Sequence, residues 1–223
     1  MDRRFLVILA VIIVALGGVF AFSKQSADNK SGGSSSAKPT SHTIGEGKKG
    51  VTLTEYGDFQ CPVCGTYYSP LKQVMAKYNS DIYFQFSNLP LVSIHPNAFA
   101  AARAAEAAGL QNKYWQMHDK LYENQTQWSS ATSALSTFKT YAKEIGLNVT
   151  QFETDYASGK VNDAINADLD AFKKTGKDQA TPTFFIDGTP VSSSSLTDPS
   201  TGAPTLEKFS AVIDAEIAKK AKQ

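Results

Sequence analysis

The sequence predicts an α/β domain with a long helical stretch between its strands, and three observations support this fold class. A strand pattern, a turn, a helical pattern and a second strand follow one another over residues 51–86. A series of helical patterns, rich in alanine at its start, then covers residues 98–174. A hairpin signal and an amphipathic helix follow from residue 183 onward.

The size and charge of the chain exclude several classes of protein. Its 223 residues, 42% of them hydrophobic, can bury one ordinary core, which excludes a collagen, a wholly disordered chain and a polytopic membrane protein. The formal net charge of +1 gives no electrostatic support for nucleic-acid binding, so we expect no nucleic-acid partner. The two cysteines cannot complete a four-ligand zinc site and the three histidines lie far apart in sequence, so we expect no bound metal.

The N-terminal segment is apolar and uncharged over Phe5–Phe22. As a helix it would be about 27 Å long, close to the hydrocarbon thickness of a bilayer, so we predict a single transmembrane anchor within residues 1–22. Arg3 and Arg4 precede the apolar run, which favours a cytoplasmic N-terminus and an extracytoplasmic body at the cell membrane. The alternative is a secretory signal peptide that is cleaved near Ala21, which would release a secreted protein.

Residues 23–50 are rich in serine, glycine and lysine and contain almost no large apolar side chains. This composition predicts a flexible linker, in which His42 is a solvent-exposed histidine. The functional domain is therefore expected to comprise residues 51–223.

The first strand and the first helix of this domain differ in their hydrophobic period. VTLTEY alternates from Val51 onward, and IYFQF forms the next strand at Ile82–Phe86. Between them, apolar residues recur at the spacing of one helix face: Cys64, Tyr67, Leu71, Val74 and Tyr78. A strand, a helix and a strand in this order predict a parallel pair.

Helical patterns follow at residues 98–108, 113–123 and 134–145, near Thr150, and at 161–174. The strand TFFI is then joined to TPV through Asp187 and Gly188, the dipeptide typical of two-residue hairpins. The last helix, over Leu206–Lys220, carries its apolar residues on one stripe.

Cys61 and Cys64 form a Cys-x-x-Cys motif where the first strand becomes a helix. At a helix N-terminus, free N–H groups and the helix dipole favour a thiolate on Cys61, and Cys64 lies one turn away, within reach of a mixed disulfide. A static disulfide or half of a metal site needs the same spacing. Glu55 lies six residues before Cys61, either as a buried proton carrier or as a solvent-facing strand residue.

Three stretches of the chain resemble the DsbA-like branch of the thioredoxin superfamily, especially its single-domain, often membrane-tethered bacterial forms. They are VTLTEYGDFQCPVC, FSNLPLVSIHPNAFAAARAAEAAGLQNKYWQMHDKLYENQ and ATPTFFIDGTPV, in the order of the family. The resemblance implies a thioredoxin fold with an inserted all-helical subdomain at about 94–159, which covers the active site. It implies catalytic roles for Cys61 and Cys64 and no cofactor beyond their redox-active disulfide.

The resemblance also assigns roles to other residues. It matches Pro182 to the family's cis-proline, expects the backbone of Thr181 to pair with an extended substrate, and matches Glu55 to the family's buried acid. Pro62 and Val63 tune the redox potential, but they lack the histidine of strongly oxidising members. The family core has a strand before the one at Val51, whereas this sequence predicts linker there.

The function expected from these observations is an extracytoplasmic thiol:disulfide oxidoreductase, a dithiol oxidase for cysteine-containing exported proteins. A membrane redox partner would re-oxidise it. The same motif also suits a reductase or an isomerase that a partner reduces. A different class of function is a non-catalytic peptide-binding module in which the cysteines form a static disulfide.

Overall fold

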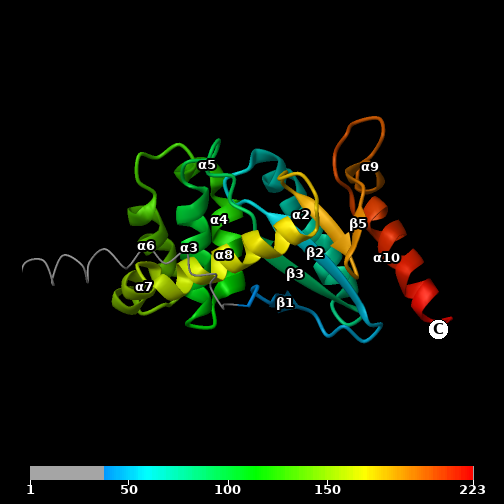
Figure 1. Ribbon diagram of the computed structural model, residues 1–223, viewed down its shortest axis with the longest axis horizontal. Coiled ribbons are helices and arrows are strands. Elements are labelled where there is room, and N and C mark those ends of the chain that lie inside the picture. The colour runs from blue at the N-terminus through cyan, green and yellow to red at the C-terminus, as the bar shows by residue number, and fades with distance from the viewer. Residues whose placement is uncertain (1–37, 223) are drawn as a thin grey trace, which may run out of the picture. The chain divides into compact units, whose positions relative to one another are not determined.

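The computed structural model describes residues 38–222, and a five-stranded sheet lies at its centre (Figure 1). The sheet order is β1-β3-β2-β4-β5, with β2 and β3 parallel and the other pairs antiparallel. The strands are β1 (His42–Ile44), β2 (Val51–Gly57), β3 (Ile82–Asn88), β4 (Thr183–Ile186) and β5 (Thr189–Val191). Both edge strands, β1 and β5, are three residues long, and β5 contains Pro190.

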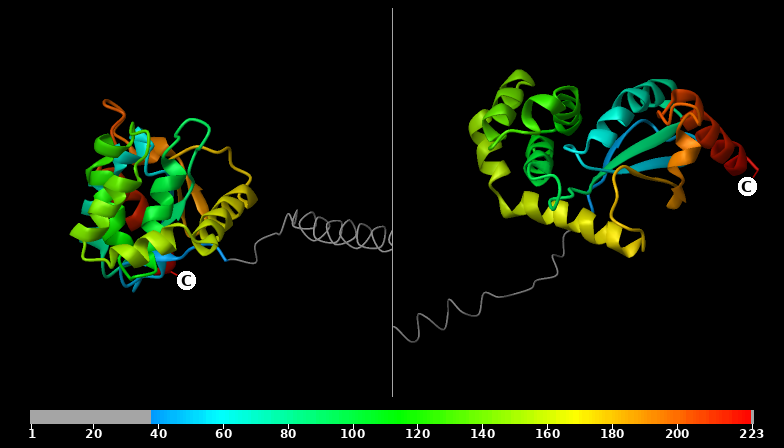
Figure 2. Two further views of the ribbon diagram at one scale, coloured as in Figure 1. Left: turned by 90° about the vertical axis from the view of Figure 1, so that its left-hand side faces the viewer. Right: turned by 90° about the horizontal axis from the view of Figure 1, so that it is seen from above.

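Two helices cover one face of the sheet, α2 (Pro62–Tyr78) and α10 (Leu206–Lys220) (Figure 2). Strand β2 alternates between buried and half-buried residues, so Leu53 and Glu55 point toward the same buried face. Tyr67 of α2 and Phe209 of α10 pack against each other there. The predicted strand, helix and parallel strand are therefore confirmed.

The chain between β3 and β4 is helical, which confirms the predicted helical insertion. Its helices are α3 (Ala98–Gly109), α4 (Tyr114–Glu123), α5 (Gln125–Trp128), α6 (Leu135–Glu144), α7 (Val149–Tyr156) and α8 (Gly159–Lys174). Buried alanines along α3 allow α4, α7 and α8 to approach closely. Helix α8 returns to the sheet, where Phe172 packs edge-on against Tyr56 on the face opposite α2.

The hairpin between β4 and β5 has the predicted two-residue turn. Asp187 and Gly188 both have positive φ, +47° and +77°, as a type I′ turn requires. The Asp187 carboxylate also accepts a hydrogen bond from the Thr52 backbone N–H at 2.8 Å, which ties the turn to β2. Short helix α9 (Ser193–Leu196) follows the hairpin and contacts α10.

The predicted linker over 23–50 is wrong at its C-terminal end. His42–Ile44 forms strand β1, which pairs antiparallel with β3 and supplies the strand that the family core requires. His42 is not a solvated histidine, because its Nε2 atom lies 2.9 Å from the Glu106 carboxylate and its ring stacks on Tyr114. Pairing with a distant strand fixes this segment although its composition is typical of a linker.

A polar cluster, called here the Asp168 cluster, connects the N-terminal end of the described residues to β3, α3 and α8. Its members are Thr40, His42, Asn88, Glu106 and Asp168. Thr40 donates to both oxygens of Asp168 at 2.7 Å, through its backbone N–H and its hydroxyl. The Asn88 side-chain amide bridges Glu106 and Asp168. This cluster fixes the point at which the chain enters the domain.

The predicted membrane anchor at Phe5–Phe22, the cleavage site near Ala21 and the linker up to residue 37 lie outside the described residues. Among the helices within residues 38–222, none has the length and apolar character needed to cross a bilayer.

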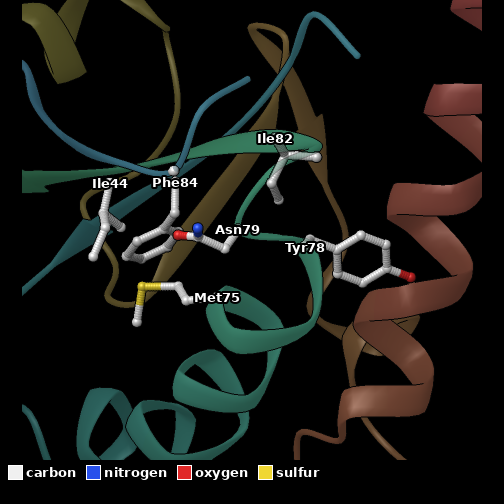
Figure 3. Close-up of a pocket in the computed structure, with 7 residues that line it drawn as sticks. Ile44, Met75, Tyr78, Asn79, Ile82 and Phe84 are labelled. Carbon is white, nitrogen blue, oxygen red and sulfur yellow. The ribbon is translucent and has the colours of Figure 1, made fainter. Parts of the chain in front are cut away.

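A small pocket lies at the C-terminal end of α2, at the opposite end of the helix from Cys61 (Figure 3). It is lined by Ile44, Gly45, Met75, Tyr78, Asn79, Ile82 and Phe84. Its cavity volume of about 10 Å³ is far below the roughly 300 Å³ at which ligand pockets begin, so this pocket is too small to bind a ligand.

Candidate active site

Cys61 is the N-cap residue of α2, directly after the turn that follows β2. Its backbone is extended, with φ −64° and ψ 120°, and Pro62 occupies the first turn of the helix, where an N–H would have no helical partner. Both cysteines are free thiols, so the structure shows the dithiol state. Cys61 is 5% exposed and Cys64 is 1% exposed.

Several hydrogen bonds lower the pKa of Cys61 to about 5. The largest contribution comes from the Cys64 thiol, followed by the side chain of Thr181 and the backbone N–H groups of Cys64 and Val63, while burial acts in the opposite direction. Within residues 38–222 the buried Thr181 hydroxyl oxygen has no hydrogen-bond partner, so the hydroxyl group is free to donate to the sulfur. Cys61 is therefore a thiolate at neutral pH.

Cys64 has the opposite electrostatic environment. Burial raises its pKa well above the ordinary value, and hydrogen bonding with Cys61 and the nearby Glu55 carboxylate raise it further. The two sulfurs thus differ in both charge and access. An incoming sulfur would meet Cys61 first, and Cys64 holds a proton behind it.

Glu55 points inward from β2, at 2% exposure. Its pKa is raised to about 8, first by burial and then by the negative charge of Cys61. Its Oε1 atom has no hydrogen-bond partner in the described part of the molecule. An unpaired buried carboxyl group with a pKa near neutrality can accept and release a proton.

The loop before β4 lies against the cysteines from the other side. The Thr181–Pro182 peptide bond is cis, as the family resemblance implied, and the Cys61 thiol contacts the Thr181 carbonyl oxygen at 3.5 Å. Strand pairing of β4 with β2 places this loop, 120 residues away in sequence, beside Cys61. Pro62 and Val63 face outward, and Val63 is 52% exposed. The structure thus brings together all seven residues singled out from the sequence.

Sequence reasoning missed the side chains that hold the active-site turn. Asp58 is buried, and its carboxylate accepts hydrogen bonds from the Gln60 and Leu91 backbone N–H groups and lies 2.7 Å from His95 Nδ1. Gln60 donates to the Ser129 carbonyl oxygen at 2.7 Å. Asp58 stands three residues before Cys61, and this spacing in a turn is the only sequence signal of its role.

Within residues 38–222, no group of three or more histidine, cysteine, aspartate or glutamate side chains is arranged to hold a metal ion. The chemistry that the site itself supplies is that of two thiols, one buried carboxyl group and a helix N-terminus.

Comparisons with known proteins agree with this arrangement. The family model described as Thioredoxin matches residues 37–215. Among solved structures, the fold is similar to BdbD from Bacillus subtilis, with a TM-score of 0.66 and 21% identity over 82% of this chain and 97% of that chain. It is equally similar to alpha-DsbA1 from Wolbachia pipientis, with a TM-score of 0.66 and 21% identity over 83% of this chain and 94% of that chain.

The curated relatives are much longer proteins. The chain is 34% identical over 151 residues to Na(+)/H(+) antiporter NhaA 1 of Mycolicibacterium vanbaalenii, which covers 66% of this chain and 23% of the antiporter. The chain therefore matches less than a quarter of the length of that relative. The family model, in contrast, spans both the sheet and the helical insertion, and the chain belongs to the thioredoxin family.

Proposed function

We propose that the protein is an extracytoplasmic thiol:disulfide oxidoreductase that acts as a dithiol oxidase on exported proteins. The observation that carries the proposal is the asymmetry of the cysteine pair. Cys61 is a thiolate at a helix N-terminus and the less buried of the two cysteines, and Cys64 is a fully buried thiol behind it. A static disulfide has no use for such a difference between its two sulfurs.

The exchange proceeds in two displacements. A substrate thiolate attacks Sγ of Cys61 in the oxidised enzyme, which breaks the Cys61–Cys64 bond and forms a mixed disulfide, and Cys64 takes up a proton. A second substrate thiolate then attacks the substrate sulfur of that mixed disulfide and releases Cys61 as a thiolate. The substrate loses two electrons, and the enzyme gains them as its dithiol form. We propose that Glu55 carries the proton of Cys64.

The direction follows from the stability of the released thiolate. A thiolate that is stabilised in the reduced enzyme makes the dithiol state favourable and the disulfide a strong oxidant. The histidine of strongly oxidising relatives is absent between the cysteines, but the Cys64 thiol, the Thr181 side chain and the helix N–H groups all stabilise the Cys61 thiolate. These donors take the place of the missing histidine.

Substrates would be recognised through their backbone. The Thr181 backbone beside the Cys61 sulfur can pair with an extended segment, as in strand addition. Exposed Val63 lies next to the sulfur, and the loop that carries exposed Val92 and Ile94 is held to Asp58 through Leu91. Backbone pairing beside apolar side chains suits unfolded cysteine-containing proteins of many sequences.

A membrane redox partner would re-oxidise the dithiol, because the two cysteines of the chain are both used in the exchange and no further cysteine is present to take up the electrons. We propose that Phe5–Phe22 anchors the protein with its catalytic domain outside the cytoplasm. Cleavage near Ala21 would give the same domain in secreted form.

The equilibrium potential of the Cys61–Cys64 pair in glutathione buffers tests the direction. We expect a value near −120 mV, the figure for a strong oxidant of this kind, whereas a value near −270 mV would indicate a reductase. In Cys64→Ser, the Cys61 thiolate should attack a disulfide-bonded substrate protein, release one substrate sulfur as a thiolate and remain in a mixed disulfide that Cys64 can no longer resolve. Cys61→Ser should form no mixed disulfide. If Cys61→Ser still oxidised the substrate, the proposed function would be wrong.

A further inference from the structure

One side chain of the helical insertion holds the backbone on which Cys61 is mounted. The Gln125 side-chain amide donates one hydrogen bond to the Phe59 carbonyl oxygen at 2.8 Å and a second to the Cys61 carbonyl oxygen at 2.9 Å. Both amide hydrogens are therefore used, and both acceptors belong to the active-site turn. The Cys61 carbonyl also accepts the first hydrogen bond of α2, from Gly65 N–H at 3.1 Å.

The residues around Gln125 fix its position. Gln125 opens the short helix α5, which ends at Trp128. Trp128 is completely buried, donates from Nε1 to the Leu121 carbonyl oxygen at 2.9 Å and packs edge-on against Phe138. The amide group therefore extends from a rigid part of the insertion rather than from a mobile loop.

Gly65 provides an independent observation that points to the same contact. It lies inside α2, where alanine is the better helix former. A Cβ atom at this position would lie 2.7 Å from Oε1 of Gln125, closer than real Cβ contacts occur. Glycine at position 65 thus leaves room for the Gln125 side chain across the first turn of α2.

We propose that Gln125 is a positioning residue, which holds the Phe59 and Cys61 carbonyl groups and thereby fixes the Cys61 sulfur against the N-terminus of α2. Carbonyl oxygens are the negative ends of peptide dipoles and oppose a neighbouring thiolate unless they are hydrogen-bonded. Fixing the Cys61 peptide also keeps the Val63 and Cys64 N–H groups directed at the sulfur. Gln125 touches neither sulfur and acts only through the backbone.

The test is a pH titration of the thiolate absorbance of the reduced protein, without substrate. Gln125→Met keeps the length of the side chain and removes both donors, and we expect the pKa of Cys61 to rise by about one unit, a tenfold lower ratio of thiolate to thiol at a given pH. The equilibrium with glutathione should shift about tenfold toward the disulfide form. Gln127→Met is the matched control, because Gln127 is exposed and its amide donates to Asn124.

A substitution at Gly65 in α2 tests the contact with the Gln125 side chain independently. Gly65→Ala should displace the Gln125 side chain and raise the pKa of Cys61 in the same direction, but should have no further effect in a Gln125→Ala background. Equal pKa values for Gln125→Met, Gln127→Met and the unmodified protein would overturn the proposal. So would a lower melting temperature of Gln125→Met without any change in the pKa, because a merely structural contact gives that result. A Gly65→Ala effect that is the same in both backgrounds would also overturn it.

The inference rests on the proposed function only for its consequence in exchange, since the titration is made on the reduced protein alone. If the unmodified protein did not oxidise a reduced substrate protein, the proposed function would fail while the titration still reported on Gln125. If the unmodified protein oxidised the substrate, but the Cys61 titration curves of Gln125→Met and the unmodified protein coincided, only the positioning role of Gln125 would be wrong.

Discussion

Glu55 in the active site and Asp168 in the Asp168 cluster are both buried carboxyl groups, yet they differ in how many hydrogen bonds their oxygens accept. The Asp168 carboxylate accepts four hydrogen bonds, from Thr40 N–H and hydroxyl and from Asn88 N–H and side-chain amide. Oε1 of Glu55 accepts none within the described residues. A buried carboxylate that accepts several hydrogen bonds connects the elements that supply the donors. A buried carboxyl group whose oxygen accepts none can bind and release a proton near neutral pH.

The largest change in the free energy of unfolding is expected for Asp168, whose hydrogen bonds hold the fold together. Asp168→Ala removes the acceptor of four donors, two on half-buried Thr40 and two on buried Asn88, and should lower the free energy of unfolding by about 3–5 kcal/mol. Asp170→Ala is the control on the same helix, because its contact with Lys173 is exposed and should contribute at most about 1 kcal/mol. Urea denaturation of the two variants checks the difference, and equal losses would contradict the structural role of Asp168.

Glu55→Gln should raise the free energy of unfolding, whereas Asp168→Ala lowers it. The pKa of Glu55 is about 8 in the folded protein, against 4.5 ordinarily, so the unfolded chain loses this proton first and stability falls as the pH rises from about 4.5 to 8. Removing the titration should stabilise the reduced protein at pH 8 by on the order of 3 kcal/mol.

Denaturation of Glu55→Gln and of the unmodified protein at low pH provides the control. Below about pH 4.5, Glu55 is protonated in both states, so the variant and the unmodified protein should unfold at the same denaturant concentration. A gain that does not depend on pH would show that Glu55 destabilises by packing and not by its charge.

A smaller effect concerns Cys61 itself. Its pKa is lowered to about 5, so the thiolate stabilises the dithiol form fully above the ordinary thiol pKa, and this contribution is lost as the pH falls toward 5. The stability of the dithiol form relative to the disulfide form should rise with pH in that window, by less than about 1.4 kcal/mol per unit because the sulfur is partly screened by solvent.

Thermal unfolding of both redox forms between pH 5 and 8 measures this slope. The Glu55→Gln background isolates Cys61, because the charge of Cys61 also affects the pKa of Glu55. A disulfide form that is the more stable one throughout would favour the static disulfide over the exchange function.

Most of the fold could be predicted because local signals carry it. The alternation of β2, the apolar face of α2 and the Asp187-Gly188 turn each specify one element within ten or so residues, and short connections then determine their pairing. Strand β1 has no such signal. It is three residues long, lies in a segment of linker-like composition and is fixed only by pairing with β3 and by the Asp168 cluster.

The candidate site also contains residues that the sequence predicts and residues that it does not. The Cys-x-x-Cys spacing is local, the strand position before Cys61 singled out Glu55, and the family resemblance favoured its buried role and supplied Thr181 and Pro182. Gln125 could not be found from the sequence, because its partners are backbone carbonyls more than 60 residues away and a carbonyl group has no residue identity. Hydrogen bonds from a side chain to a distant backbone are therefore the class of site feature that sequence patterns miss.

If the protein acts on unfolded chains, as we propose, its two short edge strands have a further consequence. Long open edges would pair with any extended segment and lead to aggregation with the client. Here β5 has Pro190 in place of a backbone donor, and β1 presents three residues, so neither edge offers a continuous ladder. The short edges thus disfavour strand addition to the sheet, and under the proposed function the Thr181 loop, next to Cys61, is the place where an extended substrate segment would bind.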